Sequence, residues 1–161
     1  MSYEISKVVK GEEVGFKNPS AEFYKAVGGE EGMRALMYDF YDIIYESDIA
    51  HFFPQDEEEF HEVKVKNTRF FIQICGGPKV YESETGGMNL DEFMIRLHDD
   101  FSIYEKSRYE WLGCMEEALR KVEMDQKIKD DFWDYLEKFS KLTVNTFSDG
   151  SVYYADYNPG Q

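Results

Sequence analysis

The chain has 161 residues, of which 42% are hydrophobic, and this length and composition suffice for one folded domain with a sizeable core. Its formal charge of −15 argues against nucleic acids and anionic membrane surfaces as partners, because their phosphates would be repelled. No apolar run is long enough to cross a bilayer, and residues 1–16 lack the apolar stretch of a signal peptide. We therefore expect a cytoplasmic protein.

The predicted elements begin with helices. Residues 1–18 show no sustained period and are interpreted as an N-terminal extension. A short helix is expected between Ser20, its predicted N-cap, and the pair Gly28-Gly29, which ends it. The next helix is predicted over 30–46, where apolar residues recur at helical spacing: Met33, Leu36, Met37, Phe40, Ile43 and Ile44.

The middle of the chain contains the longest uninterrupted helical pattern. A short helical turn, "SDIAHFFP", closes at Pro54. The long helix that follows starts in the acidic run 56–59 and ends at Gly76-Gly77-Pro78. Its predicted apolar face comprises Phe60, Val63, Phe70, Phe71 and Ile74. Residues 79–89 are predicted as a loop.

The second half continues with a brief helix, "LDEFMIRLH", over 90–98. Two longer helices are predicted over 104–122 and 125–146, and residues 148–161 are interpreted as a tail without fixed structure. No segment has a convincing strand pattern, so the predicted fold class is all-α.

Four side chains that can form hydrogen bonds lie in apolar helical surroundings: Tyr41, Asn67, His98 and Trp111. A buried amide such as that of Asn67 costs about 1–3 kcal/mol unless it finds a partner. It is therefore tied to a neighbouring backbone or directed at a polar ligand. Each of the four residues, taken alone, also fits an ordinary position in a hydrophobic core.

Taken together, these residues belong to a series of motifs. The phrases "FYKAVGG", "FY", "FFP", "FFIQICGGPKVY", "RLHDDFSI" and "RYEWLGCM" follow one another over about residues 22–146. In this order the chain resembles the truncated haemoglobins, particularly their second group. In that group Gly-Gly-Pro follows the distal helix, and the proximal histidine precedes an x-x-Phe-x-Ile phrase. The resemblance implies a two-over-two helical sandwich around a haem, formed by residues 19–147.

The resemblance also implies a set of residues around a haem b group. His98 would be the proximal iron ligand, with its other ring nitrogen donating to a carbonyl oxygen or water. The cations Arg96, Lys66 and Arg69 and the hydroxyl of Tyr81 are candidates to face the propionates. The expected apolar walls are Phe53, Val63, Phe70, Phe71, Phe93, Leu97, Phe101 and Ile103.

On the distal side, the resemblance assigns ligand binding to the donors of Tyr41, Asn67 and Trp111. Two positions depart from the pattern of the second group. Phe53 stands where a Tyr or His is common, and Asn67 stands where a larger apolar residue is common, so the amide is expected to replace the missing donor. Because Val63 occupies the position of the distal histidine of classical globins, no imidazole is expected there. The histidines His51 and His61 are expected to lie away from the iron.

The function expected from this resemblance is binding of dioxygen or another small diatomic gas, such as nitric oxide or carbon monoxide, at a five-coordinate haem iron. Donors directed at a ligand with partial negative charge would slow its escape. One alternative is a peroxidase-like or nitric-oxide-detoxifying enzyme supplied with electrons by a redox partner protein. A second alternative is a haem-free helical interaction module.

Overall fold

The computed structural model describes residues 3–81 and 89–157. Its elements follow in the order α1 (Ala21–Val27), α2 (Gly29–Tyr45), η1 (Ala50–Phe52), α3 (Glu57–Ile74), α4 (Leu90–Leu97), η2 (His98–Asp100), α5 (Glu105–Arg120) and α6 (Gln126–Lys141). The all-α prediction is confirmed, since the described part has a single isolated β-bridge and otherwise helices. None of the helices in this part is long and apolar enough to span a membrane.

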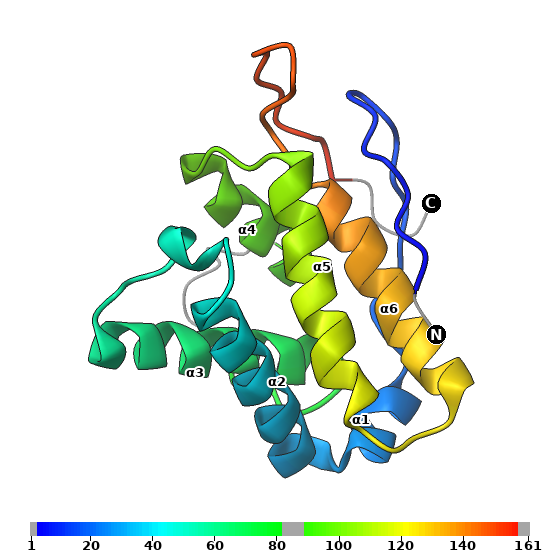
Figure 1. The fold of residues 1–161 in the computed structure, drawn as a ribbon. Coiled ribbons are helices and arrows are strands. Elements are labelled where there is room, and N and C mark those ends of the chain that lie inside the picture. The colour runs from blue at the N-terminus through cyan, green and yellow to red at the C-terminus, as the bar shows by residue number, and fades with distance from the viewer. Residues whose placement is uncertain (1–2, 82–88, 158–161) are drawn as a thin grey trace.

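The helices are arranged in two pairs (Figure 1). Helix α2 contacts α3, and α5 lies beside α6. The two pairs are joined because α2 also packs on α5, while the short α1 connects α2 to α6. Helix α4 contacts α3 and continues directly into η2, so His98 lies where the short α4 gives way to a turn.

Local signals set the bounds of these helices as expected. The Asp56 side chain caps α3 by accepting from the Glu59 backbone N–H at 3.1 Å. At the other end, the Gly77 N–H donates to the Ile72 carbonyl oxygen at 2.9 Å. A Cβ at Gly77 would lie 2.7 Å from the Tyr24 ring, so only glycine lets α1 approach this turn. Ser20 precedes α1 but makes no side-chain cap, contrary to the prediction.

The prediction was wrong at the C-terminal end. Helix α6 stops at Lys141 rather than at 146, and the isolated bridge pairs Thr146 with Val152. The tail expected to lack fixed structure instead contacts the rest of the chain, where the Tyr153 N–H donates to the Asn145 carbonyl oxygen and the Tyr157 hydroxyl donates to Asn89. Residues 82–88 of the predicted loop, the first two residues and 158–161 lie outside the described residues.

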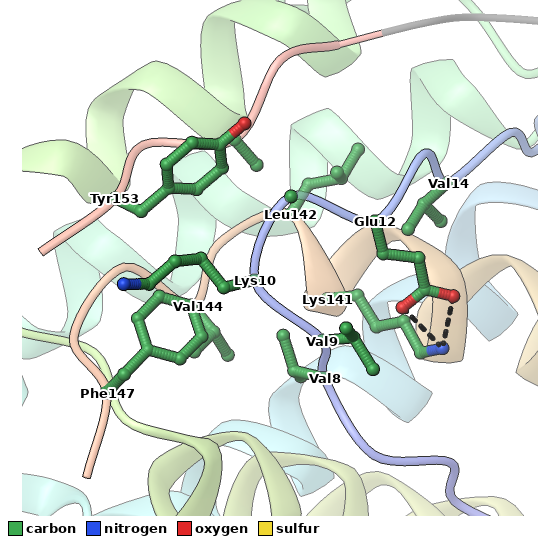
Figure 2. A pocket seen from close by; sticks show the side chains of 12 residues that line it. Val8, Val9, Lys10, Glu12, Val14, Lys141, Leu142, Val144, Phe147 and Tyr153 are labelled. Carbon is green, nitrogen blue, oxygen red and sulfur yellow. Dashed lines mark hydrogen bonds and ion pairs between the residues drawn. The ribbon is translucent and has the colours of Figure 1, made fainter. Parts of the chain in front are cut away.

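The N-terminal extension lies against the same end of the molecule (Figure 2). Lys141 on α6 pairs with Glu12 of the extension at 3.4 Å, and Phe147 and Tyr153 of the tail, which follows it, lie on the other side of this contact region. Val14 and Phe16 of the extension are buried. Both segments outside the predicted domain thus pack on its surface.

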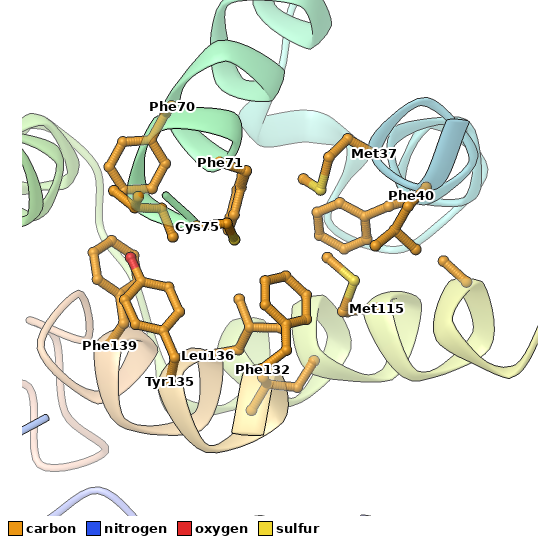
Figure 3. Packing of buried hydrophobic residues seen from close by; sticks show 14 of the residues in the cluster. Met37, Phe40, Phe70, Phe71, Cys75, Met115, Phe132, Tyr135, Leu136 and Phe139 are labelled. Carbon is orange, nitrogen blue, oxygen red and sulfur yellow. The ribbon is translucent and has the colours of Figure 1, made fainter. Parts of the chain in front are cut away.

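The core between the two helix pairs is rich in aromatic rings (Figure 3). The rings of Phe71 on α3 and Phe132 on α6 lie 6.2 Å apart, and Phe23 on α1 stacks on Phe132 at 4.1 Å. Met37 and Met115 fill the space beside Phe40. Such flexible thioethers fill the gaps that rigid rings leave between helices.

Candidate functional site

The candidate site includes the junction between α4 and η2, where His98 follows the last residue of α4. The ring Nδ1 of His98 lies 2.7 Å from the Met94 carbonyl oxygen, and donates to it. This bond fixes the ring and leaves Nε2 without a hydrogen-bond partner among the described residues. Burial lowers the pKa of the imidazole, against the opposing effects of Met94 and Asp99. His98 is therefore held in the neutral form, which can bind a metal ion.

Apolar side chains flank His98 on the surface of the molecule. Leu97 and Phe101 expose 39% and 46% of their surface, respectively. Phe101 contacts the ring of Phe52 on η1 at 6.3 Å, so the exposed surface continues toward η1. Phe93 and Ile103 are partly buried. Leu97, Phe101 and Phe52 thus form an apolar surface next to His98 that a bound group would cover.

The segment after His98 is held by a residue that the sequence-based prediction missed. Asn145 lies beyond the end of α6 and donates from Nδ2 to the carbonyl oxygens of His98 and Phe101, at 3.3 and 2.9 Å. Its Oδ1 accepts from the Ile103 backbone N–H at 2.9 Å. The sequence pattern places Asn145 inside the helix predicted over 125–146, and so gives no sign that it bonds to the segment after His98.

A second group of residues surrounds Tyr41 on α2. The Asn67 side-chain amide on α3 donates to the Tyr41 hydroxyl oxygen at 2.9 Å. The rings of Phe53 and Phe60 lie edge-on to Tyr41, with centroids 6.0 and 6.4 Å away. Burial raises the pKa of Tyr41 well above its ordinary value, an effect that the Asn67 bond only partly offsets. The phenol therefore stays protonated and keeps its own hydrogen to donate.

Trp111 on α5 is connected to this group through Phe40. The two rings meet edge-on at 5.5 Å, and Phe40 in turn contacts Tyr41 at 5.0 Å. Within the described residues, the indole N–H of Trp111 has no hydrogen-bond partner. Trp111 and Val63 are both half-buried. The structure thus links Tyr41, Asn67 and Trp111 in one cluster. Phe60 and Phe40 belong to it too, although the sequence indicated them only as apolar helix positions.

The predicted wall residues Phe70 and Phe71 of α3 both contact rings of α6, and Phe70 also links α3 to α4. Phe70 contacts Tyr81 at 6.1 Å, and Tyr81 contacts Phe93 on α4 at 6.4 Å, so these three rings connect α3 with α4. Phe71 contacts Phe132 within the core between α3 and α6. Phe71 therefore packs chiefly with core residues.

The predicted cations lie at the edge of the site. The Arg96 guanidinium pairs with Asp99 at 3.3 Å and donates to the carbonyl oxygen of Ala155 in the tail. Lys66 lies with its ammonium 6.0 Å from the Tyr81 ring centroid, and Arg69 is exposed. Arg96 thus already has an anionic partner beside His98.

The two remaining histidines are exposed. His51 Nδ1 lies 2.9 Å from the Asp48 carbonyl oxygen, and the His61 ring lies edge-on to Tyr38 at 5.9 Å. Neither contact connects them to Tyr41 or to His98.

These residues fit a haem group. One neutral imidazole has a free ring nitrogen, exposed apolar side chains flank it, and aromatic contacts through Phe70, Tyr81 and Phe93 link the distal helix to α4. The Tyr41 cluster supplies hydrogen-bond donors within an otherwise apolar set of rings.

Comparison with known proteins agrees with this arrangement. The bacterial-like globin family profile matches residues 22–145. The group 2 truncated hemoglobin YjbI of Bacillus subtilis is 30% identical over 128 residues, which cover 76% of this chain and 87% of that protein.

Solved structures give the same result for the fold. Phosphate-bound Hell's gate globin IV superposes with a TM-score of 0.75 and 29% identity, covering 92% of this chain and 88% of that one. A truncated oxygen-avid haemoglobin from Bacillus subtilis superposes with a TM-score of 0.66 and 28% identity, covering 76% and 98%. The two-over-two truncated globin fold is confirmed. The chain belongs to the bacterial-like globin family, and it is a truncated haemoglobin of the second group.

Proposed function

We propose that this globin binds haem b through His98 and holds dioxygen, or another small diatomic gas, on the opposite side of the haem. Family membership supports the haem, and a relative described as an oxygen-avid haemoglobin supports dioxygen as the ligand. The neutral His98 ring, oriented by its 2.7 Å bond to Met94, supports the proximal assignment.

The observation that carries the ligand-binding proposal is the direction of the bond between Asn67 and Tyr41. The amide donates and the phenol oxygen accepts, so the phenol hydrogen is left for a third group. The second donor of the Asn67 amide and the indole N–H of Trp111 provide further bonds. The haem, when bound, supplies a ferrous iron that takes up diatomic gases. The protein's own donors would then retain a gas that gains partial negative charge when bound.

How much the donors slow the escape of the bound gas depends on their surroundings. A hydrogen bond to a charged partner contributes about 1.5–3 kcal/mol, and about 1.4 kcal/mol corresponds to a factor of ten in affinity. Phe53 and Phe60 contact Tyr41 and keep water from its hydroxyl. Two such donors would slow the escape of dioxygen by about a hundredfold. Carbon monoxide, which carries less negative charge, would gain less from them.

The direct test is purification with haem, followed by visible spectroscopy and gas titration of the reduced protein. We expect a strong Soret band and separate spectral changes on adding dioxygen and carbon monoxide. A colourless, stably folded protein that takes up no haem would overturn the proposal and favour a haem-free interaction module.

A further inference from the structure

Asn145 is a buried polar residue outside the regular helices. It exposes 3% of its surface and follows the end of α6 at Lys141. A buried amide is tolerated only when its donors and acceptor are satisfied. Its side-chain amide is satisfied mainly by the segment 98–103, and its Oδ1 also accepts from the Thr146 hydroxyl at 2.8 Å.

The contacts of Asn145 cover this segment from end to end. Its Nδ2 donates to the carbonyl oxygens of His98 and Phe101, and its Oδ1 accepts from the Ile103 N–H. The Asn145 and Thr146 backbone N–H groups both donate to the Ile103 carbonyl oxygen at 3.0 Å. Asn145 therefore supplies partners for the Phe101 carbonyl oxygen and the Ile103 N–H, and it adds to the bond that the Phe101 N–H makes with the His98 carbonyl oxygen at 3.1 Å.

The segment needs such support because its own helical structure is short. Helix α4 has 8 residues and η2 has 3, and helices of this length have little stability in isolation. The tail adds a contact before His98, where Arg96 donates to the Ala155 carbonyl oxygen. The Tyr153 N–H donates to the Asn145 carbonyl oxygen at 2.9 Å, which fixes Asn145 itself. The tail thus contacts the chain before His98 directly, and it supports the chain after His98 through Asn145.

We propose that Asn145 is a positioning residue that sets the orientation of the His98 imidazole by fixing the backbone of 98–103. The inference rests on the proposed function, because it concerns the bond between His98 and the haem iron. Met94 fixes the ring from the α4 side, and Asn145 fixes the carbonyl end of the same residue. Loss of either constraint would let the ring turn away from its binding orientation.

The test compares Asn145→Ala with Thr143→Val in the haem-loaded protein. Thr143 is a buried neighbour whose hydroxyl donates to the Ser140 carbonyl oxygen at 2.7 Å, and no hydrogen bond joins it to 98–103 among the described residues. The readouts are the iron–histidine stretching band of the reduced protein by resonance Raman spectroscopy and the rate of haem transfer to an apoglobin acceptor.

We expect Asn145→Ala to shift or broaden the band and to raise the rate of haem loss about tenfold, equivalent to about 1.4 kcal/mol. Thr143→Val should leave both readouts at the wild-type value. A wild-type band in Asn145→Ala, or equal changes in the two variants, would overturn the inference.

A second variant covers the case in which Asn145→Ala does not fold. Asn145→Asp keeps the acceptor for the Ile103 N–H and removes both donors, so the band should shift here too, and an unchanged band would contradict the inference. Failure of the proposed function gives a different result, because the wild-type protein itself would then show no iron–histidine band.

Discussion

The Asn67 amide and the Tyr41 hydroxyl are joined by a 2.9 Å hydrogen bond between α3 and α2, in which the phenol is the acceptor. This bond holds the phenol oxygen in place and leaves its hydrogen available. In the proposed function, the pair would act as one donor group on the distal side of the haem. Substitution of either residue removes a different part of this arrangement.

Replacing Tyr41 by Phe removes the hydroxyl and keeps the ring contacts with Phe53 and Phe60. We expect dioxygen to dissociate about tenfold faster or more, because one bond to a charged partner is lost. Stopped-flow measurement on the reduced, haem-loaded protein gives this rate. Tyr45→Phe is the matched control, since the Tyr45 hydroxyl donates to the Gln55 carbonyl oxygen. A dissociation rate in Tyr41→Phe equal to that of the control would refute the role of Tyr41.

The indole of Trp111 provides an independent donor. Trp111→Phe keeps a ring beside Phe40 and removes the N–H group. We expect faster dissociation of dioxygen, with a smaller effect on carbon monoxide, because only the former carries substantial negative charge when held in the site. Trp133→Phe serves as the comparison, since the Trp133 indole donates to Glu4 of the N-terminal extension. Equal acceleration for both gases would indicate a steric role instead.

The N-terminal extension is anchored by a buried charge. The Arg108 side chain is fully buried and donates to the Ser6 and Glu137 carbonyl oxygens and to the Glu137 carboxylate, at 2.8, 2.7 and 2.9 Å. Burial alone would raise the pKa of Glu137, but hydrogen bonds from Ser6 and Arg108 hold it below its ordinary value. The carboxylate thus stays charged and paired.

Arg108→Met should lower the free energy of unfolding by about 3 kcal/mol, because three acceptors lose their guanidinium donor: the Ser6 and Glu137 carbonyl oxygens and the half-buried Glu137 carboxylate. Denaturant unfolding measures this loss, and limited proteolysis should cut the extension faster. Arg34→Met is the matched control: Arg34 pairs with Glu30 on the exposed face of α2, so its loss should cost less than about 1 kcal/mol. Equal losses in the two variants would show that Arg108 is not the anchor.

The sequence predicts some parts of the fold and site correctly and others wrongly. Periodicity and glycine punctuation predict α2 and α3 well, and the motif around His98 identifies the residue whose ring is oriented by Met94. The end of α6 is mispredicted because the Asn145 and Thr146 N–H groups donate to Ile103 and not along the helix. Such long-range partners leave no periodic signal.

The same reason explains why the sequence pattern does not predict the burial of Arg108. On a helical pattern it is one charged residue among many, and it becomes buried because both α6 and the irregular extension pack on it. Partners separated by more than a hundred residues, as Arg108 and Ser6 are, cannot be paired from local spacing.

A buried carboxyl group makes stability depend on pH. Asp91 on α4 is 2% exposed and accepts a 2.7 Å hydrogen bond from the Tyr135 hydroxyl on α6. Burial raises its pKa from 3.8 to about 6, an effect that the Tyr135 bond only partly opposes. Between these two values the folded state binds more protons than the unfolded state, so stability falls as pH rises through this window.

Asp91→Asn should remove this loss, because the amide stays neutral and can still accept from Tyr135. The difference in unfolding free energy between variant and wild type should shift in favour of the variant by about 3 kcal/mol from about pH 4 to about pH 7.5. Denaturant unfolding across this range measures it. A difference that is constant with pH would contradict the buried, proton-binding role of Asp91.

The most direct test of the account is the iron–histidine stretching band of the reduced, haem-loaded protein in variants of its three histidines. We predict that His98→Gly loses the band and regains a shifted one on addition of imidazole, while His51→Gly and His61→Gly keep the wild-type band. A wild-type band in His98→Gly, or its loss in either of the other two variants, would contradict the assignment of His98 as the haem ligand.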